Sequence, residues 1–130
     1  MERYFTNGGN MEITGLKITS AGGYGIDNSS TVVLKGSNNS ISGCGNLAVQ
    51  NNANKTITVE GGAITGNVDN KGTMTMNASV TGTVTNSGTL TQNAAVTGNV
   101  VNSGEFTVGA VSIKGNITNT GTLTATGTAV

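Results

Sequence analysis

A short block of sequence recurs four times between Val68 and Thr124, and this repeat restricts the possible folds more than any other feature. The blocks are Val68–Thr75, Val84–Thr91, Val100–Thr107 and Ile117–Thr124. Each contains an Asn followed two places later by a Gly, and the Asn residues are spaced by 16, 16 and 17 residues. Self-similarity at a fixed short period indicates a solenoid, in which each repeat stacks on the previous one.

The same register extends toward the N-terminus. Asn7, Asn28 and Asn51 follow Phe5-Thr, Ile26-Asp and Val49-Gln in the way that Asn86 follows Val84-Thr, and the earlier steps are 21, 23 and 19 residues. We therefore predict one domain over residues 1–130 with about seven coils. Because the early coils contain more residues, the cross-section should narrow toward the C-terminus.

Within each block, apolar and polar residues alternate, which is typical of a β-strand with one buried face. Leu90 lies between Thr89 and Thr91, and its column mates are Met11, Val32, Ile57, Met74, Phe106 and Leu123. Two further core columns contain Val96 with Ile64 and Ile113, and Val100 with Val68 and Ile117. Frequent Thr, Val and Gly argue against helices. A meander of antiparallel hairpins would also alternate, but like residues in register at every coil favour an all-β parallel β-helix.

The recurring Asn predicts a hydrogen-bonded ladder along one corner of the solenoid. An Asn side chain both donates and accepts, so stacked copies can bond to the coils above and below. Asn and Gly also tolerate positive φ, which we expect these bends to need. The predicted ladder consists of Asn7, Asn28, Asn51, Asn70, Asn86, Asn102 and Asn119.

Composition excludes several classes of function. Charged residues make up 9% of the chain and the formal net charge is zero, so there is no basic footprint for nucleic acid. No apolar run approaches the ~20 residues of a membrane-spanning helix. The single cysteine, Cys44, cannot form an intrachain disulfide and is expected to be a small core or turn residue.

The sequence offers little for catalysis. There is no His, which excludes His-dependent triads and His-based metal sites. Asp27 and Asp69 share a column, with Gln50 between them. Two coil spacings would place their carboxylates about as far apart as the catalytic pair of an inverting glycosidase. Neither aspartate is expected to have a cation beside it. They are more simply explained as solvated turn aspartates. We predict no enzyme, no cofactor and no metal site.

Threonines flank the inward residue of the Leu90 column in several coils and form a candidate binding face. Its members are Thr56, Thr58, Thr73, Thr75, Thr89, Thr91, Thr107, Thr122 and Thr124. This array resembles the Thr-x-Thr arrays of β-solenoid ice-binding proteins, which implies ordering of water at an ice surface. Asn10 with Glu12, Thr31 with Val33, and Glu105 depart from the pattern and divide the face into two short runs. Thr is also an ordinary outward residue on any half-exposed sheet.

The whole chain resembles the parallel β-helix passengers of bacterial surface proteins, the autotransporter and haemagglutinin-like adhesins. This resemblance rests on two recurring blocks. One is Asn-x-Gly-Thr followed by an apolar residue and a second Thr, and the other is Val-Thr-Gly-Asn. It implies an extracellular or cell-surface structural or adhesive module, with a glycan or protein as partner; ice binding is the alternative. Both ends lack an evident cap, so we expect a segment of a longer solenoid or end-to-end self-association.

Five Asn residues stand in Asn-x-Ser/Thr sequences, the acceptor pattern for N-glycosylation. They are Asn28, Asn38, Asn54, Asn77 and Asn116. In a chain this rich in Asn, Ser and Thr, such matches are expected by chance, so the sequence by itself does not select among them.

Overall fold

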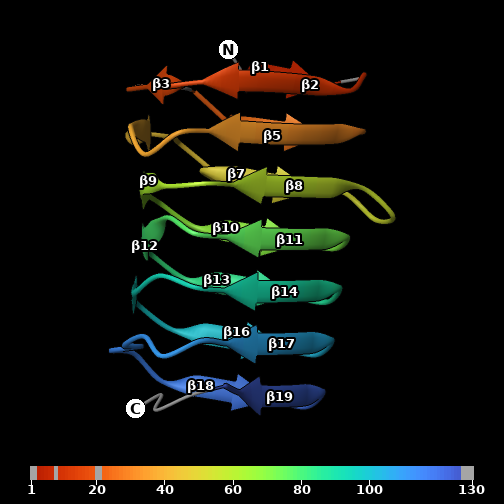
Figure 1. The fold of residues 1–130 in the computed structure, drawn as a ribbon, viewed down its shortest axis with the longest axis vertical. Coiled ribbons are helices and arrows are strands. Elements are labelled where there is room, and N and C mark those ends of the chain that lie inside the picture. Colours follow the sequence, from red (N-terminus) through yellow and green to blue (C-terminus); the bar gives the residue numbers. More distant parts are fainter. Residues whose placement is uncertain (1–2, 8, 20–21, 127–130) are drawn as a thin grey trace.

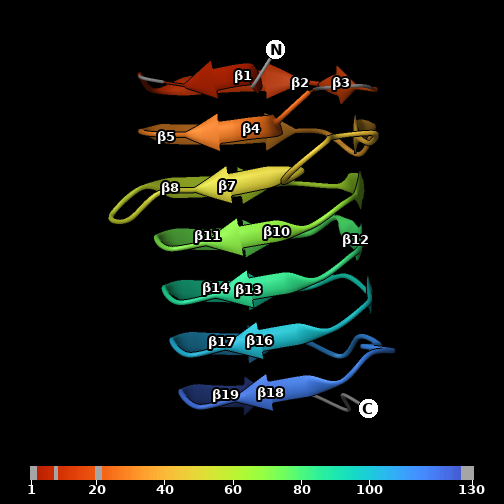
Figure 2. The ribbon, with the colours of Figure 1, turned by 180° about the vertical axis from the view of Figure 1, so that it is seen from behind.

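A computed structural model describes residues 3–7, 9–19 and 22–126. In these ranges the chain forms an all-β solenoid of about seven coils built from three parallel sheets, with no helix. Figure 1 shows the coils stacked along one axis in chain order, and Figure 2 shows the opposite side of the same stack. The predicted fold class is therefore confirmed, and the hairpin meander is excluded because every strand pairing in the described ranges is parallel.

Two sheets run the length of the solenoid with seven strands each. The first, called sheet A, contains β1 (Arg3–Asn7), β4 (Tyr24–Asn28), β7 (Val49–Asn51), β10 (Val68–Asn70), β13 (Val84–Asn86), β16 (Val100–Asn102) and β18 (Ile117–Asn119). Sheet B contains β2 (Met11–Thr14), β5 (Thr31–Lys35), β8 (Thr56–Val59), β11 (Thr73–Met76), β14 (Thr89–Gln92), β17 (Glu105–Val108) and β19 (Thr122–Ala125).

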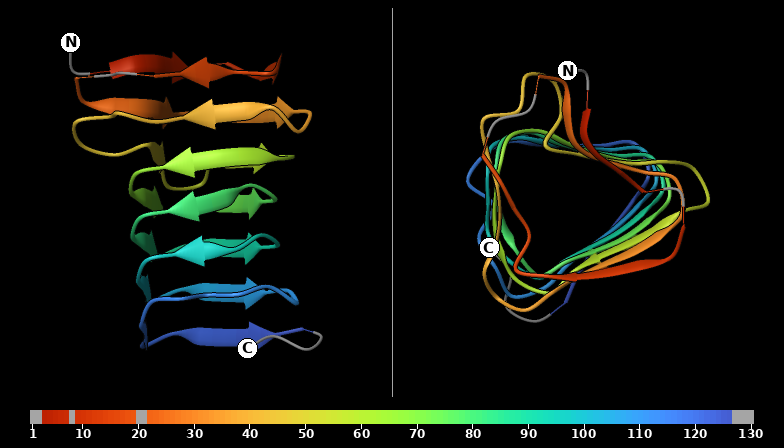
Figure 3. Two further views of the ribbon diagram at one scale, coloured as in Figure 1. Left: turned by 90° about the vertical axis from the view of Figure 1, so that its left-hand side faces the viewer. Right: turned by 90° about the horizontal axis from the view of Figure 1, so that it is seen from above.

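The third side, called sheet C, is shorter. It contains β3 (Lys17–Ile18), β6 (Asn39–Ile41), β9 (Gly62–Thr65), β12 (Ser79–Thr81) and β15 (Val96–Thr97). The sixth coil adds one isolated parallel bridge between Val96 and Ile113. Seen along the axis, the three sheets enclose a triangular cross-section (Figure 3).

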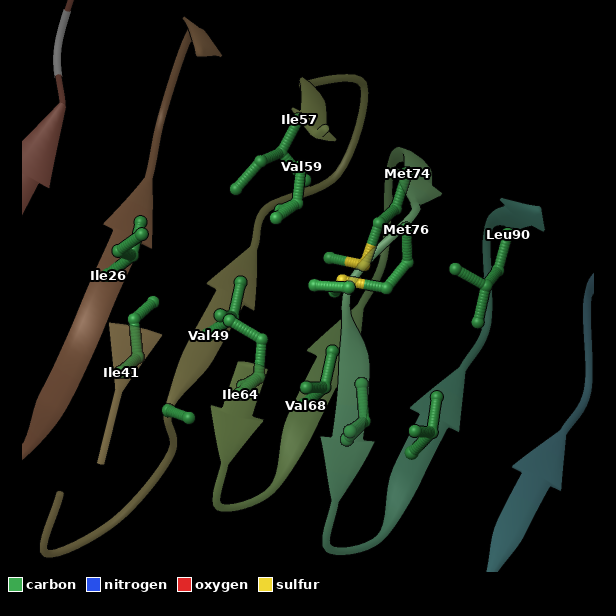
Figure 4. Packing of buried hydrophobic residues seen from close by; sticks show 14 of the residues in the cluster. Ile26, Ile41, Val49, Ile57, Val59, Ile64, Val68, Met74, Met76 and Leu90 are labelled. Carbon is green, nitrogen blue, oxygen red and sulfur yellow. The ribbon is translucent and has the colours of Figure 1, made fainter. Parts of the chain in front are cut away.

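Like residues lie opposite each other in neighbouring coils, as the repeat predicts. Leu90 pairs with Met74 on one side and with Phe106 on the other, and all three side chains are at most 1% exposed. The Val96 and Val100 columns also fill the interior, with Val80 and Val84 as further members. Figure 4 shows Met74 and Leu90 of the first column, together with Ile64 and Val68 of the other two columns, pointing into the space between the sheets. Alternation along each strand thus gives one narrow core in which Phe106 is the one aromatic residue among the described buried side chains.

The glycines of the Asn-x-Gly corner correct one expectation. Positive φ was expected at these bends, yet neither the ladder Asn residues nor Gly72, Gly88, Gly104 and Gly121 are among the described residues with positive φ. A Cβ on Gly88 would instead overlap with the carbonyl oxygen of Gly72 in the preceding coil. Glycine is therefore needed there because consecutive coils approach closely. Positive φ occurs at another corner, at Gly66, Gly82 and Gly98.

The early coils extend beyond the outline of the later ones, as their length predicts (Figure 3). One such extension is the loop between β7 and β8, which projects beyond the neighbouring coils (Figures 1 and 3). Another segment, between β6 and β7, runs beside β4 of the preceding coil, where Gly25 N donates to Leu47 O and Asn46 N donates to Gly23 O, both at 2.9 Å. Cys44 packs against the core, in line with its expected structural role.

Candidate functional site

The Asn ladder fixes the corner at which sheet A passes into sheet B. From Asn28 to Asn102, each Nδ2 donates to the Oδ1 of the Asn in the next coil, with distances of 2.7–2.8 Å. All members from Asn28 to Asn102 are at most 1% exposed, whereas Asn119 in the last described coil is exposed. The predicted ladder is therefore confirmed for six of its members. The backbone of Asn7 pairs with that of Asn28, and the Asn7 side chain lies outside the described residues.

The ladder also positions the threonine face. Each Nδ2 makes a second bond to the backbone oxygen of the first residue of the sheet B strand in the following coil. These bonds reach the carbonyl oxygens of Thr56, Thr73, Thr89, Glu105 and Thr122 at 2.9–3.1 Å. Because buried amide groups and backbone carbonyls must be paired, this network sets where each sheet B strand begins. It thereby aligns the outward side chains of sheet B from coil to coil.

Two columns of outward side chains make up the threonine face on sheet B. The first column runs through Thr31, Thr56, Thr73, Thr89, Glu105 and Thr122. The second runs through Glu12, Val33, Thr58, Thr75, Thr91, Thr107 and Thr124. All nine threonines of the predicted candidate face therefore lie on one side of the solenoid, two columns wide.

The interruptions affect the two columns differently. Glu105 interrupts the first column only, while the second keeps five consecutive threonines from Thr58 to Thr124. In each sheet B strand from β8 to β17, the first-column residue is exposed and the second-column threonine is half-buried. The sequence pattern predicted a face divided into two short runs, and the register refines this to one broken and one unbroken column.

The geometry of this face is that of a regular lattice of hydroxyl and methyl groups. Neighbouring strands are separated by ~4.8 Å, and alternate residues of a strand by ~6.6 Å. A Thr hydroxyl donates one hydrogen bond and accepts two. Glu105 is the only ionisable side chain in either column between Thr56 and Thr124, so the hydrogen-bonding groups of this stretch are mainly neutral hydroxyls.

The outer surface of sheet A holds the two aspartates considered for catalysis. Asp27, Gln50 and Asp69 share a column, as predicted. Asp27 is 6% exposed and accepts hydrogen bonds from Gln50 Nε2 at 3.3 Å and Asn52 Nδ2 at 2.9 Å. Its carboxylate is therefore held by amide donors on the adjacent coil, which argues against a role as a free acid or base.

Asp69 corrects one detail of the sequence interpretation. No cation was expected beside either aspartate, but Lys71 Nζ lies 4.0 Å from Asp69 Oδ2. Asp69 lies on β10 and Lys71 is the first residue after that strand, so a single residue separates them, and Lys71 is exposed beside the half-buried Asp69. The sequence contained this signal, since Lys71 directly follows Asn70.

Sheet C carries a second set of outward threonines that sequence reasoning did not single out. Thr65, Thr81 and Thr97 are in register and exposed. Beside them stand the small residues Ala63, Ser79 and Ala95, with Ala63 and Ser79 paired directly. The recurrence of Val80-Thr-Gly and Val96-Thr-Gly could have identified this column. It is a third polar face with shorter side chains than sheet B.

Within the described ranges, no group of three or more His, Cys, Asp or Glu residues is placed to hold a metal ion. No helix in that part of the chain has the length and hydrophobicity required to cross a membrane. Comparison of the chain with protein-family models, with curated proteins and with solved structures found no match in any of the three.

Proposed function

We propose that this chain is an extracellular structural or adhesive β-solenoid module that binds through its outer faces. The observation that carries the proposal is the register of outward side chains, which repeats the same short polar groups from coil to coil on sheet B. The resemblance of its repeats to bacterial surface adhesins supports a location at the cell surface or outside the cell.

A repeating face favours ligands that are themselves extended and rich in hydroxyl groups or amides. Neutral hydroxyls can hydrogen-bond to such groups without desolvating a buried charge. A surface glycan, or an extended stretch of a host protein, is therefore the partner that we propose. Catalysis is not part of this proposal, because the two candidate aspartates are engaged by Asn52 and Lys71.

A glycan array and a cell-binding assay with the purified chain test this proposal directly. We expect binding that is reduced by Thr75→Lys together with Thr91→Lys, which place bulk and charge on the sheet B face. The matched control is Thr81→Lys together with Thr97→Lys on sheet C, at equally repetitive outward positions. Circular dichroism of both variants must match the parent chain. Absence of binding to all glycans and cells, or cleavage of a polysaccharide by the purified chain, would contradict the proposal.

Ice binding is a second candidate function, and the unbroken second threonine column is the observation that favours it. Thr58, Thr75, Thr91, Thr107 and Thr124 present hydroxyl and methyl groups at one spacing over five coils. A lattice of this kind can hold water molecules in fixed positions. Ice-crystal shaping and thermal hysteresis measure this activity and separate it from adhesion.

Glu105 provides a sharp test of the ice-binding candidate. Replacing Glu105 with Thr completes the first column from Thr56 to Thr122 and should increase thermal hysteresis, because it removes the charged side chain that interrupts the face. Thr91→Tyr should abolish the activity, whereas Thr97→Tyr on sheet C should not. If neither the parent chain nor Glu105→Thr shapes ice crystals, ice binding is ruled out.

We also propose end-to-end association of solenoid coils. In the last described coil, Ile117 and Leu123 are each 40% exposed, although their column mates Val100 and Phe106 are at most 1% exposed. A further coil in the same register, supplied by a second copy, would bury both side chains and pair with the backbones of β18 and β19. Light scattering across a concentration series should reveal association, and a strictly monomeric species at high concentration would contradict it.

A further inference from the structure

The Asn ladder has a direction, because every bond in its described part runs the same way. From Asn28 to Asn102, the donating Nδ2 belongs to the earlier coil and the accepting Oδ1 to the following one. The second bond of each Nδ2, to the backbone oxygen at the start of the following sheet B strand, runs in the same direction. At this corner a coil therefore presents donors on its C-terminal side and acceptors on its N-terminal side.

The last described coil carries a donor that points beyond it. Asn102 Nδ2 donates to Gly104 O in its own coil at 3.0 Å. It also donates to two acceptors in the next coil, Asn119 Oδ1 at 2.7 Å and Thr122 O at 3.0 Å. Asn119 is exposed, and its Nδ2 makes the corresponding bond within its own coil, to Gly121 O at 3.1 Å. A coil stacked on this edge would supply the other two acceptors, an Asn Oδ1 and a backbone carbonyl.

The Leu90 column ends in an exposed apolar side chain at both ends of the solenoid. Its internal members are at most 1% exposed, and they are Val32, Ile57, Met74, Leu90 and Phe106. Leu123 at one end is 40% exposed, and Met11 at the other is 36% exposed. Figure 1 shows β2 and β19, the strands that carry these two residues, at opposite ends of the stack. Contact between Leu123 of one copy and Met11 of the next would continue the column and remove both side chains from water.

We propose that the C-terminal edge of one solenoid binds the N-terminal edge of a second copy, so that association is head-to-tail. This inference rests on the end-to-end association proposed above and assigns its polarity and register. Head-to-tail stacking places the amide donor of Asn119 against the acceptor side of the first coil, where Asn7 stands in the ladder column. It also keeps all coils winding in one direction, so that the strands remain parallel across the junction, as they are within sheets A and B.

Contact between two like edges does not meet these conditions. Two C-terminal edges can face each other only if one solenoid is turned over, which reverses the direction of its strands relative to the other. Such a contact would also bring two donor sides of the ladder together. An interface between unlike edges leaves one edge of each kind at the ends of the assembly, so the products grow into filaments and do not stop at dimers.

The register of the junction follows from the sheet B columns. Their continuation places Leu123 opposite Met11, and Thr124 opposite Glu12, of the next copy. Thr124 and Glu12 are both exposed and belong to the second column of the threonine face. Directly opposite residues of neighbouring strands lie within the Cα separation of about 4.4–6.8 Å that a disulfide spans. Thr14, two residues farther along β2, is exposed as well but lies out of register with Thr124.

Disulfide cross-linking tests polarity and register together. The natural cysteine is removed by Cys44→Ala, and either Glu12→Cys or Thr124→Cys is then added, each in a separate chain. Oxidised glutathione serves as the oxidant. We expect a mixture of the two variants to form linked dimers at least ~10-fold faster than either variant alone, because only the mixture brings two thiols within disulfide distance. The matched control, Thr14→Cys mixed with Thr124→Cys, should show no such increase.

Two further variants test the open-ended growth and the apolar contact. A chain that carries both Glu12→Cys and Thr124→Cys should form linked dimers, trimers and longer species. Leu123→Asp places a charge in the junction and should abolish the increase of mass with concentration in light scattering. Val101→Asp, on the outer side of sheet A and away from either edge, should leave that increase unchanged. Circular dichroism of every variant must match the parent chain.

The outcomes separate the polarity from the association itself. Linked dimers of Thr124→Cys alone would show that like edges meet, which would overturn the head-to-tail polarity and leave end-to-end association in place. An increase of mass without cross-linking in the Glu12→Cys and Thr124→Cys mixture would place the contact on another surface and overturn both. A strictly monomeric parent chain at high concentration would contradict the association, and the polarity with it.

Discussion

Asn86 donates a 2.7 Å hydrogen bond from its Nδ2 to the Oδ1 of Asn102, sixteen residues later in the chain. The same Nδ2 donates to the backbone oxygen of Glu105 at 2.9 Å, so one side chain connects its coil to the next at two points. Its bond to Gly88 O at 3.2 Å closes its own corner. A single buried amide therefore links the geometry of the corner, the coil spacing and the start of the adjacent sheet B strand.

This relationship predicts a strong effect of Asn86→Asp. The carboxylate cannot donate to Asn102, Gly88 or Glu105, and it places an unpaired charge in a site that is 0% exposed. We expect the free energy of unfolding to fall by roughly 3–5 kcal/mol, measured by urea denaturation. Asn93→Asp, at an exposed position whose Asn makes a similar bond to Asn77, should change it by less than about 0.5 kcal/mol. Equal losses in the two variants would contradict a structural role of the buried ladder.

The close approach of coils predicts that Gly88 cannot be replaced. In Gly88→Ala the added methyl group would overlap with the backbone carbonyl of Gly72, which has no rotamer that could move it aside. We expect a loss of at least ~2 kcal/mol in the free energy of unfolding, measured by thermal or urea denaturation. Gly9→Ala is the control, because its Cβ would meet nothing within 4 Å. A stable Gly88→Ala variant would show that the coils can separate at this corner.

A buried polar residue predicts a stabilising substitution. Gln92 is 1% exposed in a column with Met76 and Val108, and its Oε1 is the buried side-chain atom without a hydrogen-bond partner among the described residues. Its Nε2 donates to Ala94 O at 2.9 Å and, at 3.4 Å, to Ala78 O; Ala94 is half-buried, so water can replace the shorter of these two bonds. We expect Gln92→Met to raise the free energy of unfolding by about 1 kcal/mol. A loss of stability would instead mean that the Nε2 bonds outweigh the unpaired oxygen.

The narrow core predicts a sharp difference between inward and outward charges. Leu90→Asp buries a carboxylate between Met74 and Phe106, where no cation or donor can reach it, and should prevent cooperative folding. Val101→Asp provides the contrast, because Val101 is 42% exposed on sheet A. Its melting temperature should remain close to that of the parent chain. Circular dichroism and melting curves of both variants measure the difference.

The sequence predicted the coil arrangement well because the spacing of the repeats determines which residues stack in neighbouring coils. Once Asn70, Asn86 and Asn102 are aligned, alternation within each strand determines that Leu90 points inward and Thr89 outward. The sequence could not show why position 88 is a glycine, since this depends on the distance between the backbones of successive coils. The number of sheets could not be predicted either, because β15 is a two-residue strand and too short to show an alternating pattern.

The candidate face was predicted less completely than the fold. The nine threonines were identified because each flanks a residue of the Leu90 column. The unbroken second column needed the register, which places Thr107 next to Thr91 and Glu105 next to Thr89. The engagement of Asp27 by Asn52 was not visible either, since these residues are 25 positions apart and meet only through coil stacking.

The stacking of parallel coils is tested most directly by nuclear Overhauser effects between assigned backbone and side-chain protons. Contacts should connect residues with a constant difference of sixteen between Val80 and Phe106, as in the pairs Val80 with Val96, Val84 with Val100 and Leu90 with Phe106. Hairpins would instead connect residues whose numbers have a constant sum, because neighbouring strands run in opposite directions. A constant difference of sixteen is the expected result, and a constant sum would contradict the parallel solenoid.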